Sequence, residues 1–210
     1  MLRFNALFIF IAVATFSGVG DAQGAQLNVS VYNDAGVAPP MLNKAEFVAA
    51  TVLARAGIHV TWEKCSAPGT SAYPCDHPDI GRQLSLRITP TTIRSMQASI
   101  FGVAFLSLEG KGRYADVFYS RVLQLHDDNK TSLPDVLGCV MAHELGHLLL
   151  GSNAHSTAGI MQRQWQAAEL NQLQKGALLF THEQAIKMQQ RLSGISETQE
   201  LVAGRSLGSY

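Results

Sequence analysis

The feature that most constrains this chain is a His-Glu-x-x-His pattern formed by His143, Glu144 and His147. Residues four apart on an α-helix lie nearly above one another, about 6 Å along the axis, so the two imidazoles can converge on one ion. Glu144 lies beside that row, where its carboxylate can hold and deprotonate a water molecule. The pattern therefore predicts a helix that carries the site of a zinc hydrolase.

The residues around this pattern predict a helix over residues 133–150. Ser132 followed by Asp135, with Pro134 in the first turn, is typical of a helix start. Gly151 is placed to end the helix in a left-handed conformation. Because the helix is apolar around the pattern, we do not expect its histidines simply to face solvent.

A catalytic zinc usually takes three protein ligands and keeps one position for water, so a third ligand is needed. We predict His155, because Gly151 ends the helix and lets the chain reverse toward the ion. The alternative is a carboxylate from a later helix, for which Glu169 is the best placed. Cys139, four residues before His143, is a further candidate, but a buried thiol that packs under the helix is the commoner situation.

The chain has the length and charge of one soluble domain. It has 210 residues, and its 16 basic and 16 acidic residues give a formal net charge of zero. The basic residues are scattered, so we expect no nucleic-acid partner. We also expect no membrane association after processing, and we assume a monomer because the sequence does not indicate an oligomeric state.

The N-terminus predicts export. Arg3 gives a positive start, residues 7–13 are continuously apolar, and Gly20 and Ala22 offer small residues at cleavage-site spacing. The apolar run is shorter than the roughly 20 residues that span a bilayer. Residues 1–22 are therefore expected to be a signal peptide, with a mature start near Gln23 or, alternatively, after Ala25, and a secreted or periplasmic product.

An exported chain meets oxidising conditions, which bears on its cysteines. Cys65 and Cys75 flank a turn-rich segment that can bring its ends together. A zinc site at this pair is not favoured, because the spacing is longer than in structural zinc sites and no partner cluster lies nearby. We therefore predict a Cys65–Cys75 disulfide.

The periodicity of apolar residues predicts the other elements. We expect strands over residues 27–32, 58–63, 84–89, 101–108 and 114–122. We expect helices over residues 44–56, with a capping box from Asn43 to Glu46, over residues 165–175, and from a Thr181 and Gln184 cap to Gly194.

Two segments between these elements carry a functional reading. The turn-rich residues 109–112 would make the fourth and fifth strands antiparallel neighbours, and one of them is a candidate edge strand that could add an extended peptide. The run from His126 to Asn129 is expected to be a polar, solvated loop. The run could instead hold a cation such as calcium, but it lacks the ligand spacing of a calcium loop.

The sequence resembles the metzincin zinc endopeptidases, and the matrixin-like branch most closely. Their pattern is His-Glu-x-x-His-x-x-Gly-x-x-His, followed by a methionine turn. Gly151 and His155 follow His147 by four and eight residues, where the family has three and six. By this resemblance His143, His147 and His155 would bind Zn²⁺, Glu144 would be the general base, and Met161 would lie beneath the metal.

The resemblance also implies a fold and a domain organisation. The fold would be α+β, with a twisted mixed sheet of about five strands, an antiparallel edge strand, a backing helix and an active-site helix. Residues 23–195 would form the protease domain, with an N-terminal subdomain to about residue 151 and a small irregular and helical C-terminal subdomain. Residues 196–210 are polar and are expected to be a flexible tail.

The function implied is that of an exported zinc endopeptidase that hydrolyses a protein or peptide substrate. The alternative is an exported zinc-binding protein without proteolytic activity, either an inactive relative or a binding module. Glu144 argues against that alternative, because a purely structural site needs no general base and prefers four protein ligands.

Overall fold

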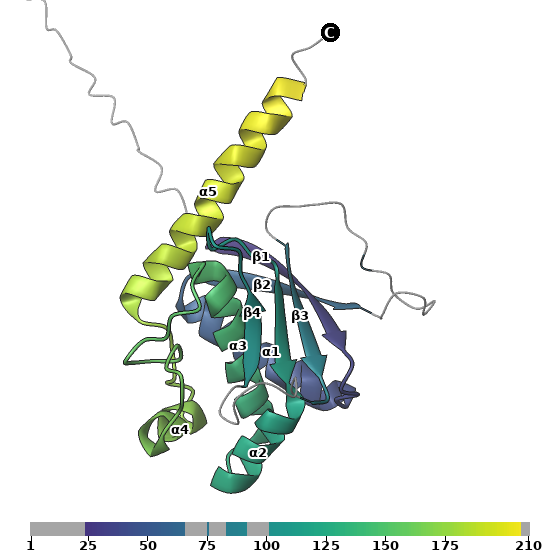
Figure 1. Cartoon of the computed structure of the whole chain (residues 1–210), viewed down its shortest axis with the longest axis vertical. Helices are drawn as coiled ribbons and strands as arrows, with labels where there is room; N and C mark the ends of the chain where they lie inside the picture. Colours follow the sequence, from purple (N-terminus) through teal and green to yellow (C-terminus); the bar gives the residue numbers. More distant parts are fainter. Residues whose placement is uncertain (1–23, 66–74, 76–82, 92–100, 207–210) are drawn as a thin grey trace, which may run out of the picture.

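The computed structural model describes residues 24–65, 75, 83–91 and 101–206. This part of the chain forms a mixed α+β fold with one sheet (Figure 1). In chain order its elements are β1 (Ala25–Asn33), α1 (Pro39–Arg55), β2 (Ile58–Cys65), β3 (Gln83–Thr89), β4 (Gly102–Phe105), β5 (Tyr114–Phe118), α2 (Tyr119–Asn129), α3 (Leu133–Leu150), α4 (Ala167–Gln174) and α5 (His182–Ser206).

The sheet has the strand order β2-β1-β3-β5-β4. Neighbouring strands are parallel except for β4 and β5, which are antiparallel, with Phe105 opposite Tyr114. The predicted antiparallel pair is therefore confirmed, and β4 is the strand at the sheet edge. The two strands are joined by a turn in which Ser107 and Gly110 form a backbone hydrogen bond of 3.0 Å.

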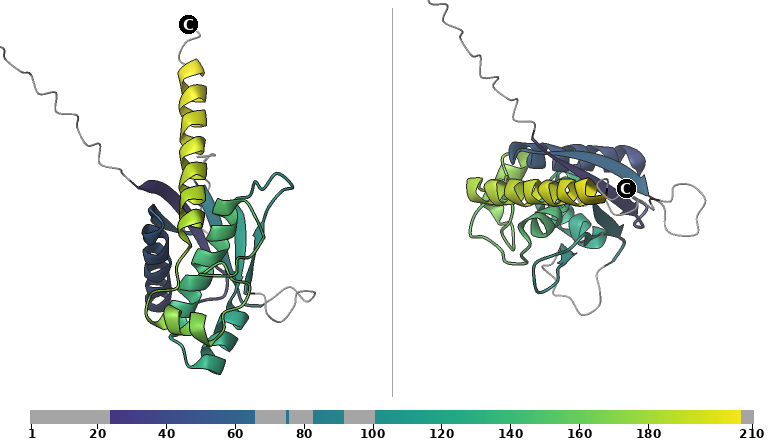
Figure 2. Two further views of the ribbon diagram at one scale, coloured as in Figure 1. Left: turned by 90° about the vertical axis from the view of Figure 1, so that its left-hand side faces the viewer. Right: turned by 90° about the horizontal axis from the view of Figure 1, so that it is seen from above.

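Alternation along β1 determines which face of the sheet is covered. Leu27, Val29 and Val31 are buried and belong to the core that α1 and α3 also enter. These two helices pack against each other (Figure 2). At Gly138 a Cβ atom would lie 2.5 Å from the Ala45 carbonyl oxygen, so glycine permits this close crossing.

Helix α3 runs through the core. Its length and composition alone would let it cross a membrane, but 78% of its apolar window is buried inside the protein. It begins after Ser132 and ends at Gly151, which has the left-handed conformation expected of it (φ 64°). The predicted boundaries are confirmed, although the Ser132 side chain makes no capping hydrogen bond.

The predicted start of the first helix was wrong. Helix α1 begins at Pro39, since a proline has no N–H to lose in the first turn and holds φ near the helical value. Asn43 therefore lies inside the helix, where its side chain accepts a hydrogen bond from Lys64 on β2. Glu46 is buried and faces the same lysine at 3.8 Å.

The predicted strand over residues 114–122 was too long. Strand β5 ends at Phe118, and α2 follows at once. The His126–Asn129 run, expected to be a loop, is the last turn of α2, which ends at Lys130 with φ 53°. The helix escaped the periodicity argument because only Val122 is buried on it, so its apolar stripe is narrow.

Two helices follow the irregular chain after α3. Helix α4 carries a capping box from Gln166 to Glu169, and α5 starts with the predicted reciprocal hydrogen bonds between Thr181 and Gln184. The predicted end of α5 at Gly194 was wrong. The helix continues to Ser206 and projects away from the sheet, so residues 196–206, expected as a tail, are helical (Figure 2).

The cysteines lie as predicted. Cys65 at the end of β2 is bonded to Cys75, with a Cα–Cα distance of 5.5 Å. Cys139 is a free, buried thiol whose pKa is raised to about 12, mainly by burial. The predicted signal peptide, residues 1–22, lies outside the described residues.

Candidate metal centre

Helix α3 presents the two histidines of the central pattern on one face. His143 and His147 are only 8% and 4% exposed, although both are polar. Their Nε2 atoms are 3.1 Å apart, as expected for imidazoles four residues apart on a helix. Two buried polar rings that point at each other require a physical explanation.

Hydrogen bonds at the other ring nitrogens provide that explanation. His143 Nδ1 donates to the Ile160 carbonyl at 2.7 Å, and His147 Nδ1 donates to the Ser152 carbonyl at 2.8 Å. A carbonyl can only accept, so both protons are on Nδ1 and both Nε2 atoms carry lone pairs. Facing lone pairs repel each other unless a cation lies between them.

The donor set fits zinc. Two nitrogens at the usual 2.0–2.1 Å from a tetrahedral zinc would be about 3.3 Å apart, close to the observed separation. A carbonyl that accepts from the remote ring nitrogen is the usual way to orient a ligating histidine. Burial, with a smaller effect of His147, lowers the pKa of His143 to about 3, so that ring is in the neutral form that binds a metal.

His155 joins the pair from the chain after α3. One ligand nitrogen from each of the three histidines can be chosen so that all lie within 4.8 Å of one another. The rings of His155 and His147 have centroids 4.9 Å apart. The pKa of His155 is lowered by burial and by the positive charge of Arg163.

The longer path from His147 to His155 is accommodated by a compact turn. Gly151 reverses the chain, and the Ser152 N–H donates back to the His147 carbonyl at 3.2 Å. The Ser152 hydroxyl accepts from the Ala154 N–H at 3.1 Å. One of the two residues beyond the metzincin spacing therefore extends the helix before Gly151, the other lies in the loop, and the third imidazole still reaches the pair.

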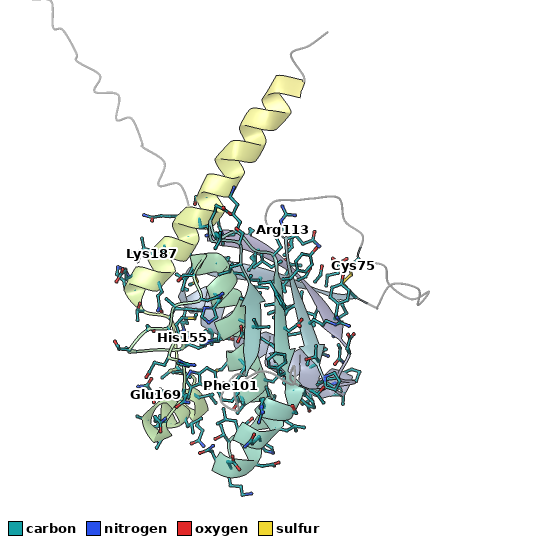
Figure 3. The ribbon with its side chains drawn as sticks, in the orientation of Figure 1. Cys75, Phe101, Arg113, His155, Glu169 and Lys187 are labelled. Carbon is teal, nitrogen blue, oxygen red and sulfur yellow. A yellow bond between two sulfur atoms is a disulfide. The ribbon has the colours of Figure 1, made fainter. Side chains whose placement is uncertain are left out.

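Glu169, the alternative third ligand, lies elsewhere. It belongs to α4, where its carboxylate accepts a hydrogen bond from the Gln166 N–H at 3.0 Å and closes the capping box (Figure 3). Hydrogen bonds from Gln162 and Gln166 lower its pKa. Its carboxylate is thus used to start a helix and is not part of the histidine cluster.

Glu144 is buried beside the histidines. It is 3% exposed, and no described residue forms a hydrogen bond with its Oε2 atom. Burial and then the charge of Asp116 raise its pKa to about 8. A Cβ atom at Gly102 would lie 2.6 Å from this carboxylate, so glycine lets the edge strand approach it closely. A carboxylate with one oxygen unpartnered among the described residues and a pKa near neutrality is suited to proton transfer.

Met161 lies beneath the cluster. Its side chain is fully buried, and a Cβ atom at Gly146, between the two helical histidines, would be 2.7 Å from its sulfur. The Met161 carbonyl accepts from the Ser156 N–H at 2.9 Å, which closes the turn that follows His155.

An open cleft of about 380 Å³ lies over these groups. Its floor is formed by the histidines and glutamate of α3, and one wall is the start of the edge strand, residues 101–104. The other wall consists of Asn153, His155 and Arg163. The edge strand and the histidine cluster therefore face one common space.

Two functional residues were missed from the sequence. Trp165, expected only as the start of a helix, donates from Nε1 to the Ile160 carbonyl at 3.1 Å, so this carbonyl accepts from both Trp165 and His143. Its ring also stacks on Phe101 with centroids 5.8 Å apart. Arg163 lines the cleft. Their nearness to Met161 in the sequence is the signal that would have pointed to them.

Comparisons with known proteins place the fold. No protein-family model matches the sequence, and no curated protein matches it. Among solved structures, a zinc-dependent peptidase from Methanocorpusculum labreanum is 17% identical, with a TM-score of 0.52 over 76% of this chain and 99% of that one. The archaemetzincin from Methanopyrus kandleri is 16% identical, with a TM-score of 0.50 over 81% of this chain and 98% of that one. The chain therefore shares its fold with these two proteins.

Proposed function

We propose that this chain is an exported zinc-dependent endopeptidase in which His143, His147 and His155 hold the metal. The observation that carries the proposal is the pair of Nε2 lone pairs, 3.1 Å apart, in a buried site that opens into a cleft. Glu144, whose Oε2 atom has no hydrogen-bond partner among the described residues, supplies the proton-transfer group that a structural zinc site has no use for. The fold shared with a zinc-dependent peptidase and an archaemetzincin supports the same assignment.

The metal and Glu144 would divide the chemistry. Bound zinc supplies Lewis acidity, which polarises the scissile carbonyl and makes a water molecule acidic near neutral pH. Glu144 takes a proton from that water on its Oε2 atom and later delivers it to the leaving amine. The carbonyls of Ile160 and Ser152 keep the first two imidazoles in the ligating tautomer throughout.

The edge strand would hold the substrate. Among the described strands, β4 is paired with β5 alone, so backbone groups on its other side could bind an extended peptide. Residues 102–104 of β4 line the cleft beside Glu144. A peptide added to this edge would bring its backbone past the carboxylate, as cleavage within a chain requires.

We also propose the metzincin class and, within it, the matrixin-like branch. The supporting features are the histidine pattern, the turn with Met161 beneath α3, and the antiparallel edge strand. The small C-terminal subdomain of that class would correspond to the chain after Gly151. The assignment to the matrixin-like branch rests on the sequence pattern of His143, Glu144, His147, His155 and Met161.

Export is part of the proposal. The bond between Cys65 and Cys75 supports it, because disulfides persist in oxidising compartments. Ala25 already pairs with Ile58 in the sheet, so a cut before Gln23 would leave β1 intact, whereas a cut after Ala25 would remove its first residue. N-terminal sequencing of the exported protein should therefore give a start near Gln23.

Replacing Glu144 with Gln tests the catalytic proposal. The variant should bind zinc as the wild type does, while casein cleavage falls by about 10²–10⁴-fold, the usual contribution of a general base. Chelation should abolish wild-type cleavage, and added zinc should restore it. Glu183→Gln, which removes an exposed carboxylate that pairs with Lys187 on α5, is the matched control.

The same assay addresses the alternative. A wild-type protein that binds zinc with these three histidines yet cleaves neither casein nor short peptides would be a zinc-binding protein without proteolytic activity. Cleavage that persists in Glu144→Gln would instead exclude Glu144 as the base.

A further inference from the structure

The charged groups of the cleft are unevenly placed. Among the described residues that line it, Glu144 has the acidic side chain and Arg163 has the permanently positive side chain. Glu144 is buried, whereas Arg163 is exposed and comes from the chain after α3. A substrate that enters the cleft therefore meets a positive charge from that chain and an uncharged edge strand.

The backbone of Arg163 is held by buried neighbours. Met161, two residues before it, is fully buried under α3, and Trp165, two residues after it, is buried and hydrogen-bonded to the Ile160 carbonyl. A bridge between Ser156 and Gln162 fixes the same turn. The guanidinium therefore extends from a fixed segment, so that less entropy is lost when it binds a partner.

We propose that Arg163 selects peptides that carry a carboxylate near the scissile bond, an inference that rests on the proposed peptidase function. A guanidinium presents a planar fork of N–H donors that matches a carboxylate with two parallel hydrogen bonds. The carboxylate has two possible sources, an acidic side chain or the C-terminus of a short peptide. Both offer the same two oxygens.

The uncharged edge strand favours a role for Arg163 in substrate recognition. Residues 101–104 offer a backbone edge and uncharged side chains, so they can hold a peptide without selecting its charge. Charge selection then falls to Arg163. A different role, stabilising the oxyanion that forms on the scissile carbonyl, would act on every substrate alike and would appear in kcat whatever the charge of the peptide.

Matched peptides separate these roles. One internally quenched peptide would carry Glu, Gln or Lys at one position at a time, over three positions on either side of the cleaved bond. A second peptide would have either a free or an amidated C-terminus. At one of these places the carboxylate peptide should have a kcat/KM about tenfold above that of its amide partner, mainly through KM, as expected for a charge-assisted hydrogen bond. The place identifies the source of the carboxylate.

Variants of Arg163 should move this ratio. Arg163→Gln should bring it to about one, Arg163→Lys should keep part of it because the charge remains without the fork, and Arg163→Glu should favour the Lys peptide. Lys175→Gln removes the same charge from the exposed end of α4, away from the cleft, and should keep the wild-type ratio. A wild-type ratio near one at every place would overturn the inference, as would an equal loss of kcat for all peptides in Arg163→Gln.

Binding distinguishes failure of this inference from failure of the proposed function. Zinc-loaded Glu144→Gln protein, with and without Arg163→Gln, would be titrated with fluorescein-labelled forms of the carboxylate and amide peptides, followed by anisotropy. Acid-selective binding that needs Arg163, in a protein that cleaves nothing, supports the recognition role and rejects the peptidase. Cleavage by the wild type, with no preference for the carboxylate peptides in either assay, supports the peptidase and rejects the recognition role of Arg163.

Discussion

Helix α3 and the irregular chain after it both supply groups to the candidate metal centre, but they position them differently. On α3 the helix repeat alone brings the Nε2 atoms of His143 and His147 to 3.1 Å. Packing in the core then fixes the whole element, because the helix is buried along almost its entire length. Few individual contacts are needed to place these side chains.

The chain from Ser152 to Gln166, between α3 and α4, has no such repeat. Met161 and Trp165 are buried in the core, and individual hydrogen bonds hold the backbone around them, such as Ile160 N–H to the Leu179 carbonyl at 2.9 Å and Trp165 Nε1 to the Ile160 carbonyl at 3.1 Å. Each bond contributes only about 1 kcal/mol. Helix α3 therefore holds its two histidines and Glu144 rigidly, whereas the loop after it determines whether the third imidazole is in place.

Removing His155 tests whether the loop is needed for the metal. His155→Ala should lower zinc affinity more than 100-fold, beyond the 10–100-fold loss typical of an outer-shell change. Competition with a chromogenic chelator measures this. Glu169→Ala, which removes only a helix cap, should leave the affinity unchanged, and the opposite pattern would transfer the third position to Glu169.

Burial on α3 gives the metal-free protein a pH signature. Folding raises the pKa of Glu144 from 4.5 to about 8, so the folded state binds this proton more tightly and loses stability as pH rises between those values. The three histidines of the cluster, whose pKa values are lowered, act in the opposite direction and still contribute near pH 6.5, so the effect of Glu144 is the difference between wild type and Glu144→Gln. Between pH 6.5 and 8 the contribution of Glu144 to the free energy of unfolding should fall by up to about 2 kcal/mol.

Urea unfolding of the chelator-treated protein at these two pH values measures that change. The fall should disappear in Glu144→Gln, which cannot ionise. If wild type and variant lost the same stability between these pH values, the Glu144 carboxylate would be solvated in the metal-free protein. Helix α3 would then be less rigid at the site than its burial predicts.

A smaller effect should come from the outermost contact of the loop. Trp165→Phe keeps an aromatic ring against Phe101 but removes the hydrogen bond to the Ile160 carbonyl, which orients His143. Zinc affinity should fall about tenfold. Trp62→Phe is a matched control, since Trp62 Nε1 is buried without a hydrogen-bond partner among the described residues. Equal affinities in the two variants would assign His143 orientation to α3 alone.

The same contrast explains what the sequence could predict. Strands with alternating apolar residues were found because burial of one face imposes a period on them. The helix over residues 133–150 was found from its start and end residues and from the histidine spacing, because it is buried on almost all sides. Helix α2 was missed because it buries only Val122. The start of α1 was misplaced because Asn43 imitates a cap, although Pro39 and Pro40 already form the first turn.

The site divides along the same line. The spacing of His143, Glu144 and His147 is readable because a helix converts sequence distance into geometry. His155 was predicted from a chain reversal at Gly151, and the structure brings it to the pair. Arg163 and Trp165 were not predicted, since their positions depend on a turn closed by contacts with Leu179 and Ser156, which no periodicity encodes.

Helix α5 ties distant parts of the chain together, which affects how the cleft forms during folding. Gln189 donates to the Ala56 carbonyl across 133 residues, and Arg191 donates to the Gly110 carbonyl, at the tip of the β4–β5 turn, across 81 residues. Such contacts raise contact order, and loops of this size close late because their entropy cost comes before any stabilising contact. The β4–β5 hairpin can pair locally, but its turn at Gly110 is therefore bound to the rest of the protein only after the C-terminal helix has been synthesised and has docked.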